Sequence, residues 1–163
     1  VEGSIIPSSD WVRFKIKVGN EEDGKRLKRV KFIFRVSYQD IWAKGKESLL
    51  VETEKGLESL PVKENFSFTV SKPKSTDLKD NERALKGNFI GAHNEESDFG
   101  LILINNHLTS VLRSYAAENF IQIVADLGEI PPKMTKETTV HLHIGFFNDL
   151  KACISQENSE DKK

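Results

Sequence analysis

NNHLTSVLRSYAAENFIQIVADLGEIPP, from Asn105 to Pro132, is the one segment of this chain with a sustained helical period. Its apolar side chains recur in steps of three and four, which keeps them on one face of a helix. They are Leu108, Val111, Leu112, Tyr115, Ala116, Phe120, Ile123, Val124 and Leu127. Possible capping residues precede this stripe, and residues that stop a helix follow it: Asn106, Thr109 and Ser110, then Gly128, Pro131 and Pro132. The pattern predicts one long helix over residues 109–127, and a stripe this wide has to be buried against another element.

Most of the remaining ordered sequence alternates apolar and polar side chains, which is the pattern of a half-buried β-strand. The alternating or apolar stretches are residues 11–18, 29–42, 47–60, 65–70, 88–92, 99–104 and 138–144. Residues 101–104 are apolar without a break, which predicts a strand covered on both faces. Several strands followed by a long helix predict an α+β fold, in which an antiparallel sheet of about four or more strands is packed by helix 109–127.

We expect a single α+β domain over residues 1–154, since 163 residues are enough to bury a core in one unit. Residues 61–98 are expected to leave that domain as an insertion or excursion, because much of the segment is polar and aperiodic. A short C-terminal helix is expected to begin near Asn148. Residues 155–163 are rich in charge and predict a disordered tail.

The composition is that of an ordinary globular protein, with 37% hydrophobic residues, 30% charged residues and a formal net charge of −1. The single cysteine, Cys153, excludes an intramolecular disulfide and fits a reducing compartment. No apolar run approaches the roughly 18–20 residues that span a bilayer. We therefore expect a cytoplasmic protein without membrane insertion. A chain that begins at Val1 rather than Met is also expected to have been processed or trimmed.

His141 and His143 lie two positions apart on a predicted strand, so both imidazoles point to the same side. A metal site needs a third and usually a fourth donor at fixed geometry, which His93 or His107 would have to supply. The alternative is that both histidines occupy polar positions of an amphipathic strand facing solvent. A His-x-His pair without a third ligand specifies little, so we predict no metal and no cofactor.

No group of residues in the sequence has the spacing of a catalytic site. Cys153 has no orienting histidine nearby, and there is no glycine-rich elbow, phosphate loop or dinucleotide fingerprint. Glu52 and Glu54 share one face of a predicted strand, with Glu58 close by. Neighbouring lysines indicate a solvated surface there rather than acid–base chemistry. We predict that the protein is not an enzyme.

Basic residues gather along the first two predicted strands and the turn between them: Arg13, Lys15, Lys17, Lys25, Arg26, Lys28, Arg29, Lys31 and Arg35. If those two strands pair, many of these side chains would share one outer surface, able to contact nucleic acid or an acidic partner. The alternative is a sheet face kept soluble by lysines, which also discourage pairing at a sheet edge. We favour the second interpretation, because a net charge of −1 lacks the basic excess of a phosphate-backbone binder.

Large apolar side chains also fall where the strand pattern requires polar ones, or at strand ends: Ile33, Trp42, Leu50 and Leu57. If they stay exposed they form a patch, and an apolar patch of that size marks a protein-binding surface. The alternative, which the sequence favours equally, is burial beneath residues 61–98 or in a subunit interface.

The predicted helix reads Val111-Leu112-Arg113-Ser114-Tyr115-Ala116, then Glu118, Ile121, Val124 and Gly128-Glu129-Ile130-Pro131. This pattern is similar to the main-helix region of the SecB export chaperones. Upstream, Leu49-Leu50-Val51-Glu52, Gly56-Leu57 and Leu60 resemble the third strand of that fold, and downstream Phe147-Asn148-Asp149-Leu150 resembles its short final helix. Ser114 stands where the family usually has proline, and the chain lacks the family's marked acidity. The chain is therefore more similar to solitary or toxin–antitoxin-associated SecB-like proteins than to export SecB itself.

The resemblance implies ATP-independent, chaperone-like binding of unfolded or extended polypeptide in an apolar groove between sheet and helix. It also implies a homo-oligomer, either a dimer or a tetramer, with client polypeptides as partners. Binding of nucleic acid is not expected, because the net charge is −1. The candidate groove residues in this chain are Ile33, Trp42, Leu50, Leu57 and Phe120. The alternative function is that of a structural or assembly protein of a phage or mobile element, which uses the same apolar surfaces as a subunit interface.

Overall fold

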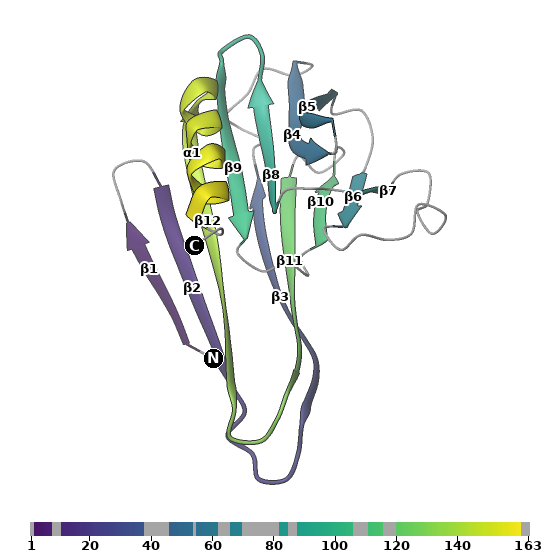
Figure 1. Cartoon of the computed structure of the whole chain (residues 1–163), viewed down its shortest axis with the longest axis vertical. Helices are drawn as coiled ribbons and strands as arrows, with labels where there is room; N and C mark the ends of the chain where they lie inside the picture. The colour runs from purple at the N-terminus through teal and green to yellow at the C-terminus, as the bar shows by residue number, and fades with distance from the viewer. Residues whose placement is uncertain are drawn as a thin grey trace.

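The computed structural model describes residues 2–7, 11–37, 46–53, 55–61, 66–69, 82–84, 88–105, 111–115 and 120–160. These residues form β-strands and an α-helix (Figure 1). In chain order they are β1 (Glu2–Pro7), β2 (Trp11–Gly19), β3 (Leu27–Ser37), β4 (Glu47–Thr53), β5 (Gly56–Pro61), β6 (Phe66–Thr69), β7 (Glu82–Ala84), β8 (Phe89–Asn94), β9 (Phe99–Asn105), β10 (Val111–Tyr115), β11 (Phe120–Ile130), β12 (Thr135–Phe146) and α1 (Phe147–Glu160).

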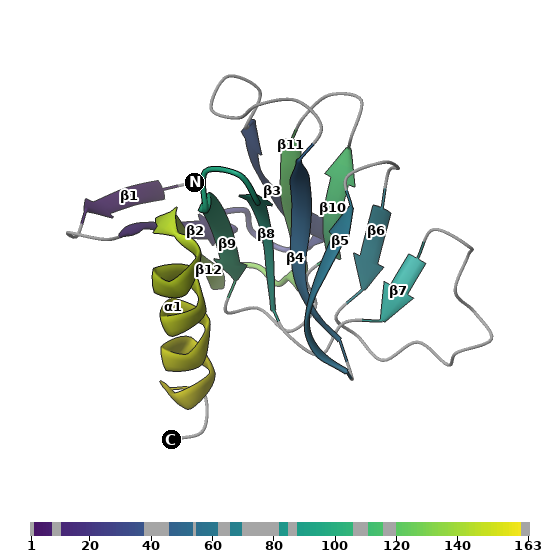
Figure 2. The same ribbon diagram turned by 90° about the horizontal axis from the view of Figure 1, so that it is seen from above.

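The strands form two sheets that face each other across an apolar core (Figure 2). The larger sheet has the order β1-β2-β12-β9-β8-β4-β5, and the smaller sheet has the order β3-β11-β10-β6-β7. Strand β6 runs parallel to β7, and the other described pairs of neighbouring strands are antiparallel. Successive side chains of a strand point to opposite faces, so alternate residues of the two sheets meet in the core.

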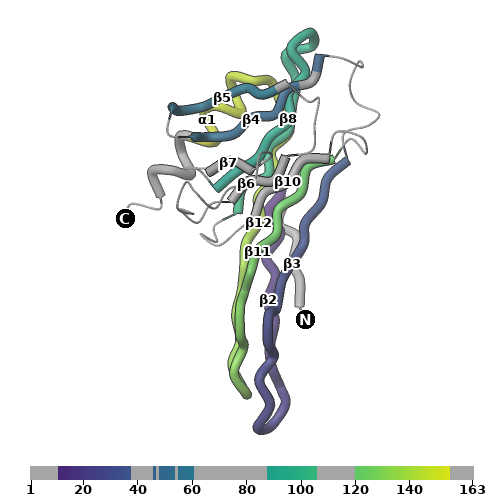
Figure 3. The backbone as a smooth tube through the Cα atoms, turned by 90° about the vertical axis from the view of Figure 1, so that its right-hand side faces the viewer, coloured from purple at the N-terminus to yellow at the C-terminus, as the bar shows by residue number. Residues whose placement is uncertain are grey.

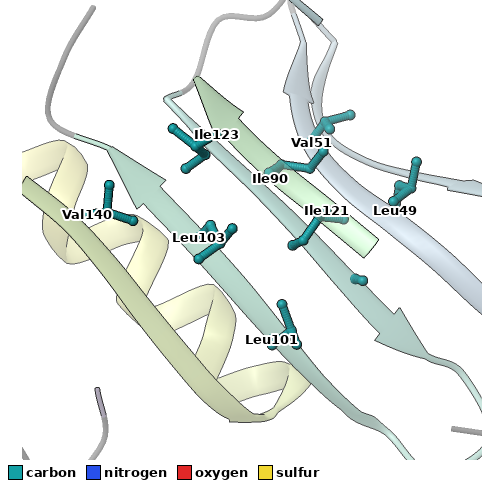
Figure 4. Close-up of a cluster of buried hydrophobic side chains, with 9 residues drawn as sticks. Leu49, Val51, Ile90, Leu101, Leu103, Ile121, Ile123 and Val140 are labelled. Atoms are coloured by element: carbon teal, nitrogen blue, oxygen red, sulfur yellow. The ribbon is translucent and has the colours of Figure 1, made fainter. Parts of the chain in front are cut away.

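The core takes its fully buried side chains from both sheets (Figure 4). They are Leu49 and Val51 of β4, Ile90 and Ala92 of β8, Leu101 and Leu103 of β9, Ile121 and Ile123 of β11, and Val140 of β12. The rings of Phe14 and Phe34, with centroids 4.5 Å apart, join the two sheets between β2 and β3. The fold is therefore a β-sandwich.

The predicted α+β fold, with a helix over residues 109–127, is wrong. Within this segment the structure describes β10 and most of β11, which pair antiparallel. Strand β11 is buried on both faces, since Ile121 and Ile123 point into the core while Phe120 and Val124 are buried on the opposite side. A strand that is apolar on both faces also contains apolar steps of three and four, so the periodicity did not separate helix from strand.

The predicted short C-terminal helix is present as α1, on the face of the larger sheet that points away from the smaller one (Figure 2). A second apolar cluster attaches it to the sheet: Leu150 and Ile154 of α1 with Phe89, Ile102 and Ile104. Helix α1 includes residues 155–160 of the predicted tail, and residues 161–163 lie outside the described part of the chain. From the predicted excursion 61–98, β8 lies inside the larger sheet between β9 and β4.

The β2–β3 and β11–β12 connections lie at the same end of the molecule, and the strands that lead to them extend beyond the rest of the sandwich (Figures 1 and 3). We call residues 15–32 and 125–139 the arm. Strands β2 and β12 continue the larger sheet into the arm, and β3 and β11 continue the smaller one. The arm has buried side chains of its own: Ile16, Ala125, Leu127, Ile130 and Thr138.

Strand β11 is irregular inside the arm. Its register with β3 shifts between Asp126 and Gly128 and again between Gly128 and Ile130. Gly128 adopts the left-handed conformation, with φ of 64°, and its N–H donates to Asp126 Oδ1 at 2.8 Å. On β3, Arg29 is also left-handed, with φ of 56°. The sequence indicated the left-handed conformation for Gly128, but it belongs to a β-bulge, which increases local twist, and not to the end of a helix.

Candidate functional site

The structure does not bring the predicted groove residues together. Ile33 is 56% exposed on β3, at one edge of the smaller sheet, and Leu57 is 39% exposed on β5, at an edge of the larger sheet. The contact between Phe14 and Phe34 places β3 against the β2 side of the larger sheet, far from β5 in the strand order.

Two further predicted groove residues, Leu50 and Phe120, offer no surface. Leu50 is completely buried on β4, and Phe120 is only 4% exposed on β11. The guanidinium of Arg35 lies 4.0 Å from the centroid of the Phe120 ring and donates to Gln122 Oε1 at 3.0 Å. Trp42 lies outside the described residues. Because residues 109–127 form no helix in their described part, the sheet–helix groove that these residues were expected to line has no counterpart there.

His141 and His143 do share one face of β12, as predicted, and the indole of Trp11 lies against both. Ring centroids are 5.1 Å apart for Trp11 and His141, and 6.0 Å apart for Trp11 and His143. Arg13 donates from Nε to His141 Nε2 at 3.2 Å and covers the Trp11 ring at 4.6 Å. In the described residues, no three His, Cys, Asp or Glu side chains gather as metal ligands would. The expectation that both histidines face solvent is wrong for His143, which is 4% exposed; Trp11 lies against both imidazoles, and Arg13 contacts that of His141.

The basic residues of the first two strands do not form one surface, which corrects the arrangement that a pairing of these strands would have produced. Strands β2 and β3 belong to different sheets, so their outward side chains point in opposite directions. Several of these residues are paired with acids: Lys15 with Glu137 at 3.2 Å, Arg26 with Glu129 at 2.6 Å and Lys31 with Asp126 at 3.6 Å. A contiguous basic face is absent from the described strands.

A different surface stands out among the exposed large apolar residues of the described chain, which are Ile33, Leu57, Met134, Ile144 and Phe146. The first three lie on separate elements, whereas Ile144 and Phe146 are two positions apart on β12 and share one face. They are 49% and 57% exposed. The Phe146 ring meets the Phe99 ring edge-on at 5.7 Å. We call Ile144, Phe146 and Phe99 the apical patch.

The apical patch lies where β12 extends past its neighbour. Strand β12 pairs with β2 as far as His143 opposite Trp11, but with β9 as far as Phe146 opposite Phe99. From Ile144 to Phe146, β12 therefore has a described partner strand on its β9 side only. An edge strand offers backbone donors and acceptors to a further strand, and here the edge also carries apolar side chains.

The junction beside the patch is firmly held. Helix α1 begins directly after Phe146, and the N–H of Phe147 donates to the carbonyl oxygen of Asp98 at 3.1 Å. The imidazole of His93 stacks on the Phe147 ring at 4.5 Å and contacts Asp98 Oδ1 through Nε2 at 3.2 Å. The sequence assigned Ile144 to the inward face of its strand, and that face is correct. No sequence signal showed that the opposite layer would leave the side chain uncovered.

We call residues 20–26 and 131–134, which connect β2 to β3 and β11 to β12, the arm tip. The arm tip lies at the opposite end of the molecule from the patch and carries a further exposed apolar side chain, that of Met134. It is 55% exposed and borders a mainly polar hollow of about 530 Å³. The hollow is lined by Lys17, Gly19, Asn20, Glu21, Lys133, Met134 and Thr135. Asn20 is buried beneath it and is hydrogen-bonded to both connections of the tip.

No known family model matches the chain, and no curated protein matches it in sequence. The chain is similar in structure to the Slr1438 protein from Synechocystis sp. PCC 6803, with a TM-score of 0.52 at 10% sequence identity. The match covers 88% of this chain and 54% of that protein, so this chain spans about half the length of Slr1438. At this identity the likeness concerns the fold alone. In the described residues, no helix has the length and apolar character needed to cross a membrane.

Proposed function

We propose that the protein is a non-enzymatic assembly protein whose copies associate through the apical patch. The observation that carries the proposal is the pairing of Ile144 and Phe146 on one face of β12, where the described residues give that strand a partner on its β9 side only. Exposed apolar groups scattered singly are normal, but adjacent ones at an open strand edge favour a protein contact. The reducing environment that a single cysteine favours fits a cytoplasmic location.

The size of the patch sets a limit on what it can do alone. Full burial of an exposed Ile or Phe side chain contributes about 1.5–3 kcal/mol, and Ile144 and Phe146 are already about half-buried, so the pair contributes roughly 1.5–3 kcal/mol on docking. Association itself costs an estimated 4–15 kcal/mol in lost freedom of motion. The patch can therefore anchor a contact, but a stable interface also needs area outside it, since such interfaces bury about 800 Å² on each partner.

Binding of unfolded polypeptide, as a SecB-like protein would do, stays a prediction. Its structural basis was a groove beside a long helix, and the described chain has neither. An open apolar edge could instead take up an extended segment by strand addition. The two functions differ in a measurable way, because an assembly protein associates with itself in the absence of any unfolded client.

Sedimentation velocity over a wide range of protein concentration tests the proposal. We expect the wild-type mass to rise with concentration, and Ile144→Thr or Phe146→Thr to return the protein toward the monomer while its thermal unfolding stays cooperative. Ile33→Thr is the matched control, since Ile33 is as exposed as Phe146 but isolated. A wild-type protein that stays monomeric throughout rejects the proposal. If that monomer prevents aggregation of an unfolded test protein, client binding is the better function.

A further inference from the structure

We infer that the apical patch receives the arm tip of a second copy of this chain, so that copies join head to tail. This inference rests on the proposed function and names the surface that occupies the patch. The occupant is the end of the arm around Met134, and the contact continues along the flanks of the arm toward its basic residues.

The arm tip is built as a fixed shape. Asn20 donates from Nδ2 to the carbonyl oxygens of Lys25 at 2.8 Å and Ile130 at 3.0 Å, which joins the β2–β3 connection to the end of β11. Its backbone N–H donates to Met134 O at 2.9 Å, and its own carbonyl oxygen accepts from the N–H of Lys133 at 2.8 Å. A surface fixed before binding loses little conformational freedom on docking.

The turn that presents Met134 is held from the other side as well. Lys133 adopts the left-handed conformation, with φ of 59°, and its Nζ donates to the carbonyl oxygen of Glu21 at 2.7 Å. The same Nζ forms an ion pair with Asp23 at 3.1 Å. The backbone at Met134 is therefore fixed, while its unbranched side chain stays adaptable. A methionine of this kind can fit an uneven apolar surface and contact aromatic edges such as that of Phe146.

The distance between the two surfaces makes the contact intermolecular. The arm tip lies at one end of the long axis, and the β8–β9 turn, next to Phe99 and α1, lies at the other (Figure 1). A rigid arm cannot fold back onto its own patch. A contact between two different surfaces on two copies leaves one free arm and one free patch, so it propagates into a filament or closes into a ring.

Charge favours the arm as the occupant. The arm holds nine basic residues against six acidic ones, a net charge of +3: Lys15, Lys17, Lys25, Arg26, Lys28, Arg29, Lys31, Lys133 and Lys136 against Glu21, Glu22, Asp23, Asp126, Glu129 and Glu137. Beside the patch, the described β8–β9 turn and the residue before β4 carry three exposed acids and one lysine, a net charge of −2: Glu95, Glu96 and Asp98 with Lys46. Opposite net charges steer the two surfaces together and fix their orientation.

The same charges disfavour a two-fold contact of patch on patch. Glu95 and Asp98 lie in the turn that leads into Phe99, so two facing patches would bring the acids of both copies together. Like charges across an interface oppose association. On the arm, Lys17, Lys25 and Lys28 are exposed and form no ion pair with another described residue, which leaves them available to acids of a neighbouring copy.

Two variants, each with one damaged surface, test the head-to-tail contact. Met134→Gln keeps the patch and damages the tip, whereas Phe146→Thr keeps the tip and damages the patch. We expect each variant alone to sediment as a monomer, with a dissociation constant roughly tenfold or more above that of the wild type. An equimolar mixture is expected to form a one-to-one dimer and nothing larger, because one intact tip and one intact patch remain.

The mixture separates the possible failures. If Phe146→Thr is monomeric but Met134→Gln assembles like the wild type, the patch meets another patch; the head-to-tail inference is then wrong and the proposed function survives. If both variants are monomeric and the mixture is too, the head-to-tail contact is also rejected. A wild type that never associates rejects the proposed function itself. Dimer formation in the mixture shows at the same time that both variants are folded.

A separate variant tests the attraction between the basic residues of the arm and the acids beside the apical patch. The double substitution Lys17→Glu and Lys25→Glu reverses two exposed charges of the arm without touching Met134. We expect it to weaken association and to reduce its sensitivity to salt, since screening acts on the attraction that the variant removes. Lys55→Glu, in the exposed β4–β5 turn, is the control for reversing one charge away from the arm, and it is compared with Lys17→Glu alone as well as with the double variant. Unchanged association of the double variant contradicts the assignment of the arm.

Discussion

Asn20 links the two chain connections of the arm tip through a single side chain. It is 2% exposed, so each of its polar atoms has to find a partner in the protein. Its Nδ2 donates to two carbonyl oxygens, and its Oδ1 accepts from the N–H of Glu22 at 3.3 Å. An amide supplies both donors and an acceptor in one plane, which an aspartate or a serine cannot do.

Asn20→Ala should lower the free energy of unfolding by about 1–3 kcal/mol, because the buried carbonyl oxygen of Ile130 loses a donor. Urea denaturation measures this loss. Ser59→Ala, at an exposed position of β5, is the control and should stay within about 0.5 kcal/mol of the wild type. A variant at Asn20 that is as stable as the wild type would show that the tip is held by its backbone bonds alone.

Ile33 and Leu50 show how far a residue's position in a strand pattern can be interpreted. In both cases an apolar side chain occupies a position that the alternation assigns to the outer face. Ile33 is exposed on the edge strand β3, whereas Leu50 is fully buried on β4 inside the larger sheet, so each of the two open alternatives holds for one of them. Alternation gives the face on which a side chain lies, but what covers that face depends on residues distant in sequence.

At the scale of elements, a pair of glycines controls the fit of α1 on the larger sheet. Gly100 of β9 lies directly opposite Gly145 of β12. A Cβ at Gly100 would lie 2.7 Å from the carbonyl oxygen of Ala92 and 3.0 Å from Leu150 Cδ1. A Cβ at Gly145 would meet only Asp149 Cβ, at 4.0 Å. The two positions share strand pairing but differ in available space, and the close approach of Leu150 requires the first one to be glycine.

Gly100→Ala should therefore destabilise the protein by about 1–3 kcal/mol, the usual effect of overpacking. The clash is with backbone as well as with the helix, so a side-chain rotation cannot relieve it. Gly145→Ala is the matched variant and should leave stability within about 0.5 kcal/mol. Thermal unfolding of the two proteins measures the difference, and equal melting temperatures would contradict the close packing of α1 on β9.

The sequence predicted two kinds of strand correctly: strands with clean alternation, and the continuous apolar run 101–104, which lies in β9 and is buried on both faces. Residues 11–18 and 138–144 alternate cleanly and form β2 and much of β12. The helix over residues 109–127 was predicted wrongly because the apolar residues recur in steps of three and four and the polar residues Gln122 and Asp126 stand four apart, a spacing that fits a helix as well as a strand. Without that helix, the SecB resemblance loses the element on which most of its matching residues lay.

For the whole molecule, connectivity was the least predictable property. Strands β2 and β3 are consecutive and could have formed a pair, yet they enter different sheets because the turn between them lies at the arm tip, where the two layers meet. The apical patch depends on the same long-range arrangement, since Ile144 and Phe146 lie on the core-facing side of β12 and are exposed only where the opposite layer does not cover them. Local sequence patterns contain neither fact.

Hydrogen exchange can show whether the arm and the rest of the sandwich open as one unit. Strands β2, β3, β11 and β12 run from the rest of the sandwich into the arm, and Thr138 donates from Oγ1 to Asn105 Oδ1 at 3.1 Å where they join, with both residues buried. We expect the ladder amides of the arm around Leu127 and Ile130 to be protected like those of the core strands, because opening them requires breaking the same strands. The amide of Asp98 in the exposed β8–β9 turn serves as the fast reference, since the amides of Glu95, Glu96 and Ser97 are hydrogen-bonded.

Fast exchange throughout the arm would contradict this rigidity. It would also mean a weaker head-to-tail contact. A mobile arm would have to be ordered on docking, and that entropy would oppose the modest gain from burying Met134 against the patch. The bulge at Gly128 is where such mobility would begin, since the β3 ladder is interrupted there. The stricter measurement compares the exchange of amides on the two sides of Gly128. A hinge at Gly128 would leave the amides of the arm tip unprotected and those nearer the core strands protected.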